Sequence, residues 1–287
     1  MRDNLYPYKS NKLFKYNQFI YIKCQKYTMT LINFSDPTAT FIALCTLTII
    51  VFCRYVLMSG AFYVLFYYYF KDTFWHRKIS EGLRPQGQAL TEIKWSAITS
   101  FIFALSGVAL IWLWQMGYTN IYINIEQYSL LYLPISLVLG LFIHETYYYW
   151  LHRWMHRPKI YRWIHKTHHD SIITSPWTSF SFHPMESILQ AIVVPLIVIF
   201  LPMHHTVIMT MLVLMTVSAT INHLDIEIYP KDTEKHWFGK WIIGATHHSM
   251  HHAKFIKNYG LYFTFWDKWM GTESTDYEQL FRDKTNR

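Results

Sequence analysis

Histidines are the residues of this sequence most able to do chemistry. The chain has 16 of them, and all except His76 fall between His144 and His252. Spacings of three and four place side chains on one face of a helix, so a motif with such spacings can direct several imidazoles at one point. At this histidine frequency about 0.05 HxxHH patterns are expected by chance. Two are present beside one HxxxH, as His152-Arg-Trp-Met-His156, His165-Lys-Thr-His168-His169 and His248-Ser-Met-His251-His252.

These motifs predict a metal site, because imidazole is a good ligand for Zn, Fe, Cu and Ni. Eight histidines exceed what one ion can use, so the site is predicted to hold two ions. His223 follows the last apolar stretch and is expected as a ninth ligand, while His183 and His247 are open between ligand and supporting roles. The predicted ligands are His152, His156, His165, His168, His169, His223, His248, His251 and His252.

Neutral imidazoles around two divalent ions leave about four positive charges, which require acidic neighbours. Glu145, Tyr149, His152 and His156 follow one helical stripe. We therefore expect Glu145 to bond a ligand imidazole from one layer behind, and we take Tyr149 as a second catalytic candidate. The alternative role for Glu145 is a helix-end residue at the membrane interface. Weaker candidates for the supporting carboxylate are Asp170, Glu186, Asp225 and Glu227.

The elements that must position these residues are apolar. Hydrophobic residues make up 52% of the chain and charged residues 15%, against roughly 25% charged in a soluble domain. Residues 38–70 carry only Arg54, and 95–125 and 127–144 carry no charge. The uncharged stretch after Glu186 is too long for one crossing and contains Pro202, so it predicts a helical hairpin over 187–222 or two short half-buried helices. An all-α, polytopic membrane protein is expected.

Basic residues predict the orientation of these helices. The 71–94 loop contains Lys71, Arg77, Lys78, Arg84 and Lys94, whereas residues 116–127 contain no Lys or Arg. The first loop is therefore expected in the cytoplasm, which places the histidine motifs on the cytoplasmic face. The basic N-terminal tail conflicts with this arrangement unless residues 38–70 form a re-entrant hairpin or the native chain starts at Met29. No secretory signal is recognised.

The predicted organisation has four parts. Residues 1–37 form an N-terminal tail, 38–151 the transmembrane helices, 152–271 a histidine-rich catalytic region that includes the membrane hairpin, and 272–287 a solvated C-terminal tail. The net charge of +8 comes from scattered basic residues, which argues against nucleic-acid binding and favours contact with an anionic leaflet. Three cysteines, two of them in an apolar run, imply no disulfide framework.

Several motifs together resemble the fatty acid hydroxylase / sterol desaturase superfamily, and within it most resemble sterol C-5 desaturases (lathosterol oxidases). The resemblance covers about residues 140–274 and includes the histidine motifs, Ser181-Phe-His-Pro-Met-Glu186, Asn258-Tyr-Gly-Leu-Tyr-Phe-Thr-Phe-Trp-Asp267 and Gly271-Thr272. It implies a cytoplasmic-face di-iron oxygenase in a bacterial inner membrane or the endoplasmic reticulum. It also implies two Fe ions held by the nine histidines, O2 as co-substrate, a lipid or sterol substrate, and a cytochrome b5-type or ferredoxin-type electron donor.

The expected reaction is sterol-type desaturation or hydroxylation of an aliphatic C–H bond. Sterol desaturases usually carry Asp where this chain has Glu145, so fatty acid or sphingolipid hydroxylation is the alternative within the superfamily. A histidine-rich metal transporter is the alternative from another class. Transporters place their ligands near the bilayer midplane in broken helices, whereas these motifs lie past the ends of the apolar runs. A scaffold without metal is opposed by the completeness of all three motifs.

Overall fold

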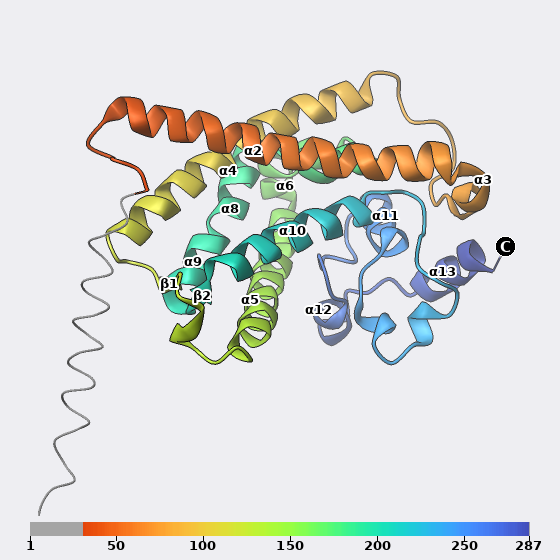
Figure 1. Cartoon of the computed structure of the whole chain (residues 1–287). Helices are drawn as coiled ribbons and strands as arrows, with labels where there is room; N and C mark the ends of the chain where they lie inside the picture. Colours follow the sequence, from red (N-terminus) through yellow and green to blue (C-terminus); the bar gives the residue numbers. More distant parts are fainter. Residues whose placement is uncertain (1–30, 287) are drawn as a thin grey trace, which may run out of the picture.

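The fold is almost entirely helical in the computed structural model, which describes residues 31–286 (Figure 1). The proposed start at Met29 and most of the basic tail lie outside the described residues. The helices are α2 (Pro37–Val64), α3 (Lys71–Phe74), α4 (Gln88–Gln115), α5 (Tyr132–Met155), α6 (Pro158–Ile164), α7 (Lys166–His169), α8 (Pro184–Ala191), α9 (Val193–Phe200), α10 (His205–Asn222), α11 (Ala245–Lys254), α12 (Phe265–Trp269) and α13 (Tyr277–Thr285).

Helix α2 is a single long helix, because nothing in its sequence stops it. The Asp36 side chain accepts a hydrogen bond from the Thr38 amide, and Pro37 occupies the first turn, where proline costs no hydrogen bond. A π-helical turn, Leu65–Tyr69, continues it, so that the helical segment has 33 residues. At 1.5 Å per residue this is about 50 Å, more than the apolar thickness of a bilayer. Of the two alternatives offered for the basic tail, the re-entrant hairpin over 38–70 is therefore wrong.

Within residues 31–286, three helices are long and apolar enough to cross a membrane: Pro37–Tyr69, Gln88–Gln115 and His205–Asn222. Large apolar side chains such as Phe41, Ile49 and Leu57 are exposed on α2, as expected of a surface that lipid covers. The uncharged run 127–144 was also expected to cross. It contributes to α5, which begins only at Tyr132, and α5 falls outside this group of three because its second half carries polar residues and a run of tyrosines.

Figure 1 shows how the long helices lie against one another, and the largest group of buried apolar side chains lies between α5, α9 and α10. Helix α2 packs on α4, and α10 packs on α5 and α2. Between α8 and α10 the chain turns at strand β2 (Met203–His204), which pairs in parallel with β1 (Ile121–Tyr122) in the register Ile121 to Met203. This strand pairing joins the connection between α9 and α10 to the segment between α4 and α5. Met203, Val207 and Met211 are among the side chains buried there.

The C-terminal elements α11, α12 and α13 gather beside the end of α10 (Figure 1). Residues 272–287 were expected to form a solvated tail, but α13 packs against α11 and buries Tyr277 and Phe281 beside Met250. The Arg282 guanidinium pairs with the buried Glu234 carboxylate at 3.0 Å. The end of the chain thus supports the helix that carries the last histidine motif.

Candidate metal centre

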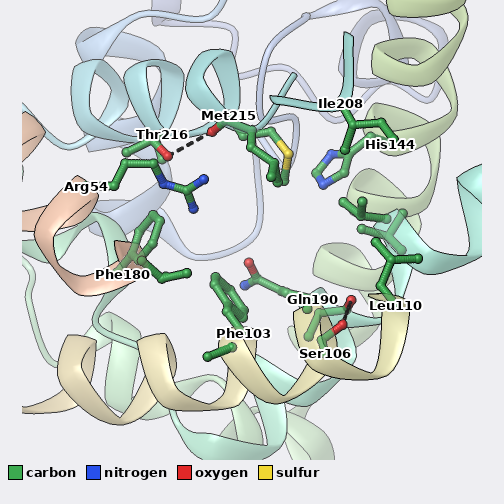
Figure 2. A pocket seen from close by; sticks show the side chains of 18 of the residues that line it. Arg54, Phe103, Ser106, Leu110, His144, Phe180, Gln190, Ile208, Met215 and Thr216 are labelled. Atoms are coloured by element: carbon green, nitrogen blue, oxygen red, sulfur yellow. Dashed lines mark hydrogen bonds between the residues drawn. The ribbon is translucent and has the colours of Figure 1, made fainter. Parts of the chain in front are cut away.

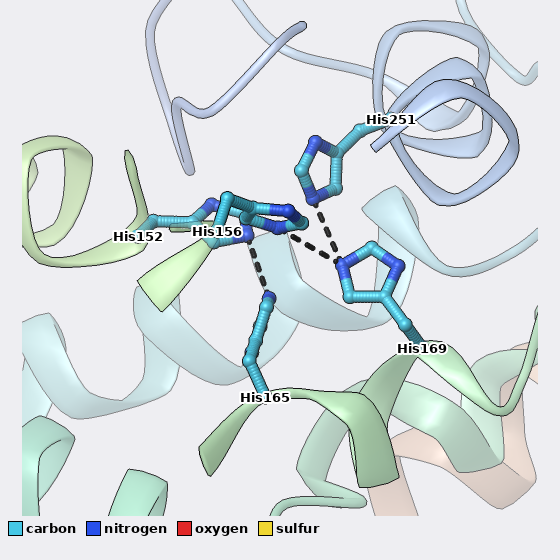
Figure 3. A group of neighbouring side chains, drawn as sticks. All are labelled: His152, His156, His165, His169 and His251. Carbon is cyan, nitrogen blue, oxygen red and sulfur yellow. Dashed lines mark hydrogen bonds between the residues drawn. The ribbon is translucent and has the colours of Figure 1, made fainter. Parts of the chain in front are cut away.

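Nine histidines converge into two groups in which the candidate ligand atoms lie within 4.8 Å of one another. They are the same nine that the sequence predicted. The first group, shown in Figure 3, is His152, His156, His165, His169 and His251. The second group is His168, His223, His248 and His252. Below they are called the five-histidine group and the four-histidine group.

Four separate parts of the chain supply these side chains. The first motif occupies the C-terminal end of α5, the second spans the junction of α6 and α7, and the third lies on α11. His223 is the C-terminal cap of α10. Within the second motif, His165 and His169 face one group whereas His168 faces the other, so α7 is shared between the two. All nine are buried except His156, which is half-buried.

Backbone carbonyls determine the protonation of several of these imidazoles. A carbonyl oxygen only accepts, so a ring Nδ1 beside it must carry the proton, and the Nε2 of the neutral ring is then a free lone pair. Four rings donate in this way, with Nδ1 to oxygen distances of 2.8 Å (His152 to Tyr259), 2.7 Å (His251 to Lys257), 3.2 Å (His168 to Ser181) and 2.7 Å (His223 to Ala219).

The Nε2 atoms meet at the centre of each group. The separations are 3.0 Å for His152 and His165, 3.2 Å for His156 and His169, 3.1 Å for His169 and His251, 3.2 Å for His168 and His223, and 3.0 Å for His223 and His248. Where both rings carry their proton on Nδ1, as in the pair His168 and His223, two lone pairs face each other without a proton between them. A cation bound by both atoms removes that repulsion, so the arrangement fits a metal in each group.

Burial also favours the metal-binding form of these rings. It lowers the pKa of His248, His251 and His252 well below the usual value for histidine, and the neighbouring imidazoles lower it further. The rings are therefore neutral at physiological pH, and only a neutral imidazole offers a lone pair to a metal.

One carboxylate lies directly behind a candidate ligand, and it belongs to Glu186. Its Oε2 is 2.9 Å from His165 Nδ1, and both side chains are fully buried. A carboxylate in this position orients the imidazole and makes it a stronger ligand. Glu186 was only a weaker candidate for this role, because its separation from His165 in the sequence gives no sign of their contact.

Glu145 has a different role from the one expected. Its two oxygens accept hydrogen bonds from the amides of Leu261 and Tyr262, at 3.0 and 2.7 Å, and not from an imidazole. The expectation that Glu145 bonds a ligand ring is therefore wrong. The same loop presents the Tyr259 carbonyl to His152, so Glu145 supports that ligand through the backbone.

Asp267 holds the other half of this loop and was missed by sequence reasoning. Its carboxylate accepts from the amides of Tyr259 and Gly260, at 2.9 and 2.8 Å. A Cβ at Gly260 would lie 2.7 Å from the Phe263 carbonyl oxygen and 3.0 Å from Glu145 Oε1, so only glycine fits between them. The sequence of the Asn258–Asp267 motif shows an acid near a glycine. It does not show which backbone amides that acid bonds.

The remaining candidates lie outside both groups. The Tyr149 hydroxyl bonds Thr272 at 2.8 Å and receives a hydrogen bond from Arg153. His183 caps α8, where its Nδ1 accepts from the Met185 amide. His247 is buried 3.9 Å from an Asp267 oxygen, and burial lowers its pKa to about 4.

Three acids named as weaker supporting candidates also bond other partners. Asp170 pairs with Lys166 on the exposed face of α7. Asp225 accepts from Ser80, and Glu227 accepts from the amide and hydroxyl of Thr246.

A largely apolar cavity of about 300 Å3 leads to the four-histidine group (Figure 2). It lies among α2, α4, α5, α8, α9 and α10, and His223 forms part of its wall. Ala219, one turn before His223 on α10, also lines it, as do Phe180 and Leu261. The cavity thus extends from the long apolar helices to the candidate metal centre.

Comparisons with known proteins agree with this arrangement. The family model for fatty acid hydroxylase matches residues 137–272, which contain all nine histidines. The Delta(7)-sterol 5(6)-desaturase ERG3B of Gibberella zeae is 32% identical over 57% of this chain and 49% of its own length. The lathosterol oxidase of Homo sapiens is 30% identical over 73% of this chain and 70% of its own length. No solved structure matches the chain significantly.

The match thus spans about half of the fungal relative and somewhat more than two thirds of the human one. Both relatives are named as sterol oxidoreductases, and the paired histidine groups beside an apolar cavity fit a lipid oxygenase. The chain belongs to the fatty acid hydroxylase family, in which it resembles the sterol C-5 desaturases.

Proposed function

We propose that this protein is a membrane-bound non-haem di-iron oxygenase that desaturates or hydroxylates an aliphatic C–H bond of a lipid. The observation that carries the proposal is the pair of histidine groups, whose Nε2 lone pairs converge at two adjacent points beside an apolar cavity. Such imidazole sets suit Fe, and the five- and four-histidine groups would hold one ion each. A bound iron pair supplies the activation of O2 and the removal of hydrogen from carbon.

The protein's own residues supply position and exclusion of water. The Nδ1–H groups of His152, His168, His223 and His251 donate to carbonyls and keep those four rings turned toward the centre, and Glu186 offsets part of the charge that two cations would bring. The apolar cavity admits the body of a lipid while His223 lies at its wall. Because no proton has to be removed by a base to break an aliphatic C–H bond, no catalytic base is assigned.

Sterol-type oxidation is the first candidate reaction, because the relatives are named as sterol desaturases and lathosterol oxidases. Hydroxylation of a fatty acid or sphingolipid is the second, supported by the family model. A metal transporter is disfavoured by the position of the ligands at helix ends, since His152 and His156 close α5 and His223 caps α10. Electrons would come from a cytochrome b5-type or ferredoxin-type donor.

Lipid profiling tests the proposal. Cells producing the wild-type chain should gain a double bond or hydroxyl on one lipid class under O2, and cells producing His251→Ala at equal membrane abundance should not. The matched control is His76→Ala, because His76 is exposed and outside both groups. An unchanged lipid profile in the wild type, or the same new product from His251→Ala, would contradict an oxygenase centred on these histidines.

We further propose that the metal centre faces the cytoplasm, as the basic 71–94 loop suggests. Single cysteines introduced in that loop, in residues 152–185 and after His223 should resist an impermeant thiol reagent added from outside. A cysteine in the 116–127 segment is the matched control and should react. Labelling of the first three from outside would reverse the orientation.

A further inference from the structure

Arg54 is the only charged residue between residues 38 and 70 and lies near the middle of the helix Pro37–Tyr69. By the rise of an α-helix it is more than about 20 Å from either end, too far for its side chain to reach the ends of that helix. Charged residues inside membrane spans are rare and face an interior cavity or a partner. The position of Arg54 therefore requires an explanation.

The cavity that leads to His223 contains the Arg54 side chain. Figure 2 shows its guanidinium pointing toward the middle of the cavity. It is the only Asp, Glu, Lys or Arg among the described residues that line the wall, which is otherwise formed mainly by side chains such as Leu47, Phe103 and Leu110. A single cation therefore faces an otherwise uncharged space.

The part of the chain that the structure describes provides no acid to neutralise this cation. Among residues 31–286, no acidic side chain forms an ion pair with Arg54, and its buried Nε has no hydrogen-bond partner. Glu92, a buried acid on the neighbouring helix, is instead bonded by Gln88, Ser171 and Thr178 at 2.7 Å each. Among the described residues, the fold thus satisfies the buried Glu92 carboxylate but gives the half-buried Arg54 guanidinium no acidic partner.

Several other polar groups of the wall already have partners. The Ser106 hydroxyl donates to the Ala191 carbonyl at 2.9 Å, and the Thr216 hydroxyl donates to the Leu212 carbonyl, also at 2.9 Å. Nδ1 of His144 lies 3.2 Å from the Tyr262 hydroxyl. These three groups need no ligand, whereas the Arg54 guanidinium is the one formal charge among the described residues of the wall and lacks an ion-pair partner.

We propose that Arg54 binds the anionic group of an acidic lipid whose apolar part fills the cavity toward His223. The inference rests on the proposed function and specifies the substrate class of that site, an acidic lipid in place of the neutral sterol that the names of the relatives suggest. A guanidinium binds carboxylate and phosphate oxygens through two parallel hydrogen bonds, and a low-polarity wall strengthens them. A neutral lipid would leave the cation buried without compensation. The anionic group thereby fixes the register of the lipid, and the register selects the carbon that lies beside the four-histidine group.

Binding of radiolabelled palmitate and of its methyl ester to the purified full-length protein in phosphatidylcholine nanodiscs tests this proposal. At about pH 8, the wild type should bind palmitate at least about tenfold more tightly than the ester, since each tenfold step needs only one charge-assisted contact. Arg54→Met should abolish this preference. Arg162→Met is the matched control, because Arg162 is exposed on α6 and does not line the cavity; it should keep the preference.

Arg54→Lys keeps the charge but not the two parallel hydrogen bonds of a guanidinium. It should therefore still prefer palmitate over the ester, but with weaker affinity. If Arg54→Met does not fold, the test uses Arg54→Lys in its place. Phosphatidic acid, tested in the same way, distinguishes a phosphate from a carboxylate as the anion. Selective binding of either one that depends on Arg54 supports the proposal. Equal binding of palmitate and its ester together with no selective binding of phosphatidic acid, or a preference that survives in Arg54→Met, overturns it. Binding needs no turnover, so failure to oxidise lipid would contradict the proposed function without altering this result.

Discussion

The two histidine groups differ in what surrounds them. In the five-histidine group, His165 lies against the buried Glu186 carboxylate, and His152 and His251 donate to backbone carbonyls. In the four-histidine group the described residues provide only carbonyls behind the rings, at Ser181 and Ala219. That second group, however, includes His223, which forms part of the wall of the apolar cavity.

This difference separates two requirements of the site, which are compensation of the metal charge and contact with the substrate. The protein compensates charge beside the five-histidine group, where the Glu186 carboxylate is buried behind His165 and is not part of the cavity wall. It leaves the side that faces the cavity free of acids, which would repel an anionic lipid and would be costly against an apolar wall. We therefore expect changes near the first group to act on metal retention and changes near the second to act on the substrate.

Removing one ligand should have the largest effect, and it should act on each group separately. The wild type should carry close to two transition-metal ions, and His251→Ala or His168→Ala should each lose at least one, because each ring is one of only five or four ligands. Activity should fall below detection in both. Metal analysis of purified protein measures this, with exposed His76→Ala as the control. Full metal content in either ligand variant would remove that histidine from its group.

The carboxylate behind the five-histidine group should have the next largest effect. Glu186→Gln keeps the shape but removes the charge beside His165, so metal affinity should fall about 10- to 100-fold. Competition with a chelator measures this affinity. The loss of affinity should affect only one of the two metal ions. Equal weakening of both ions would mean that the two groups are not independent in the way their surroundings suggest.

Glu145 should act on stability more than on metal. Glu145→Gln replaces one of two amide-accepting oxygens with a donor, which leaves the Leu261 or Tyr262 amide unsatisfied and should cost about 1 to 3 kcal/mol. The expected fall in Tm is on the order of 2–12 °C. Glu145→Asp retains both acceptors and should be tolerated better. A variant that loses metal at unchanged Tm would restore a direct role for Glu145 behind a ligand.

Narrowing the cavity beside the second group should affect turnover alone. Ala219→Leu places extra volume one turn before His223, and misplacement of a lipid there should cost about 1 to 2 kcal/mol, or roughly tenfold in kcat/KM. Metal content should not change. Leu214→Ala, on the exposed side of α10, is the matched control. Metal loss in Ala219→Leu would show that the change reaches the ligands and not only the substrate.

The smallest effect is expected at Asp170, which directly follows His169 in the sequence. Its side chain pairs with Lys166 at 2.5 Å on an exposed surface, and such pairs contribute at most about 1 kcal/mol. Asp170→Asn should therefore leave metal content and activity within about twofold of the wild type. A loss comparable to that of Glu186→Gln would show that sequence proximity to the motif matters more than contact.

The sequence by itself determined which histidines gather into the two groups and the class of protein. Spacings such as His165 to His168 and His169 act through the local geometry of a helical turn, which is known before the fold is known. Long uncharged runs likewise predict apolar helices, because burial of a charge in lipid is costly wherever the helix packs. For that reason the nine predicted histidines and the continuous apolar segments reappear in the structure.

Only the tertiary structure decided which partner each supporting group meets. Glu145 bonds amides 116 and 117 positions away. Glu186 lies on α8, whereas its partner His165 lies between α6 and α7. Helical periodicity placed Glu145 on the same stripe as His152, but a stripe does not show which neighbouring segment covers it. In the same way, the sequence marked Arg54 as an isolated charge, and only the packing of α2 against α4 and α10 placed it in a cavity. Contacts between distant segments depend on the packing of the whole chain, and no local pattern encodes them.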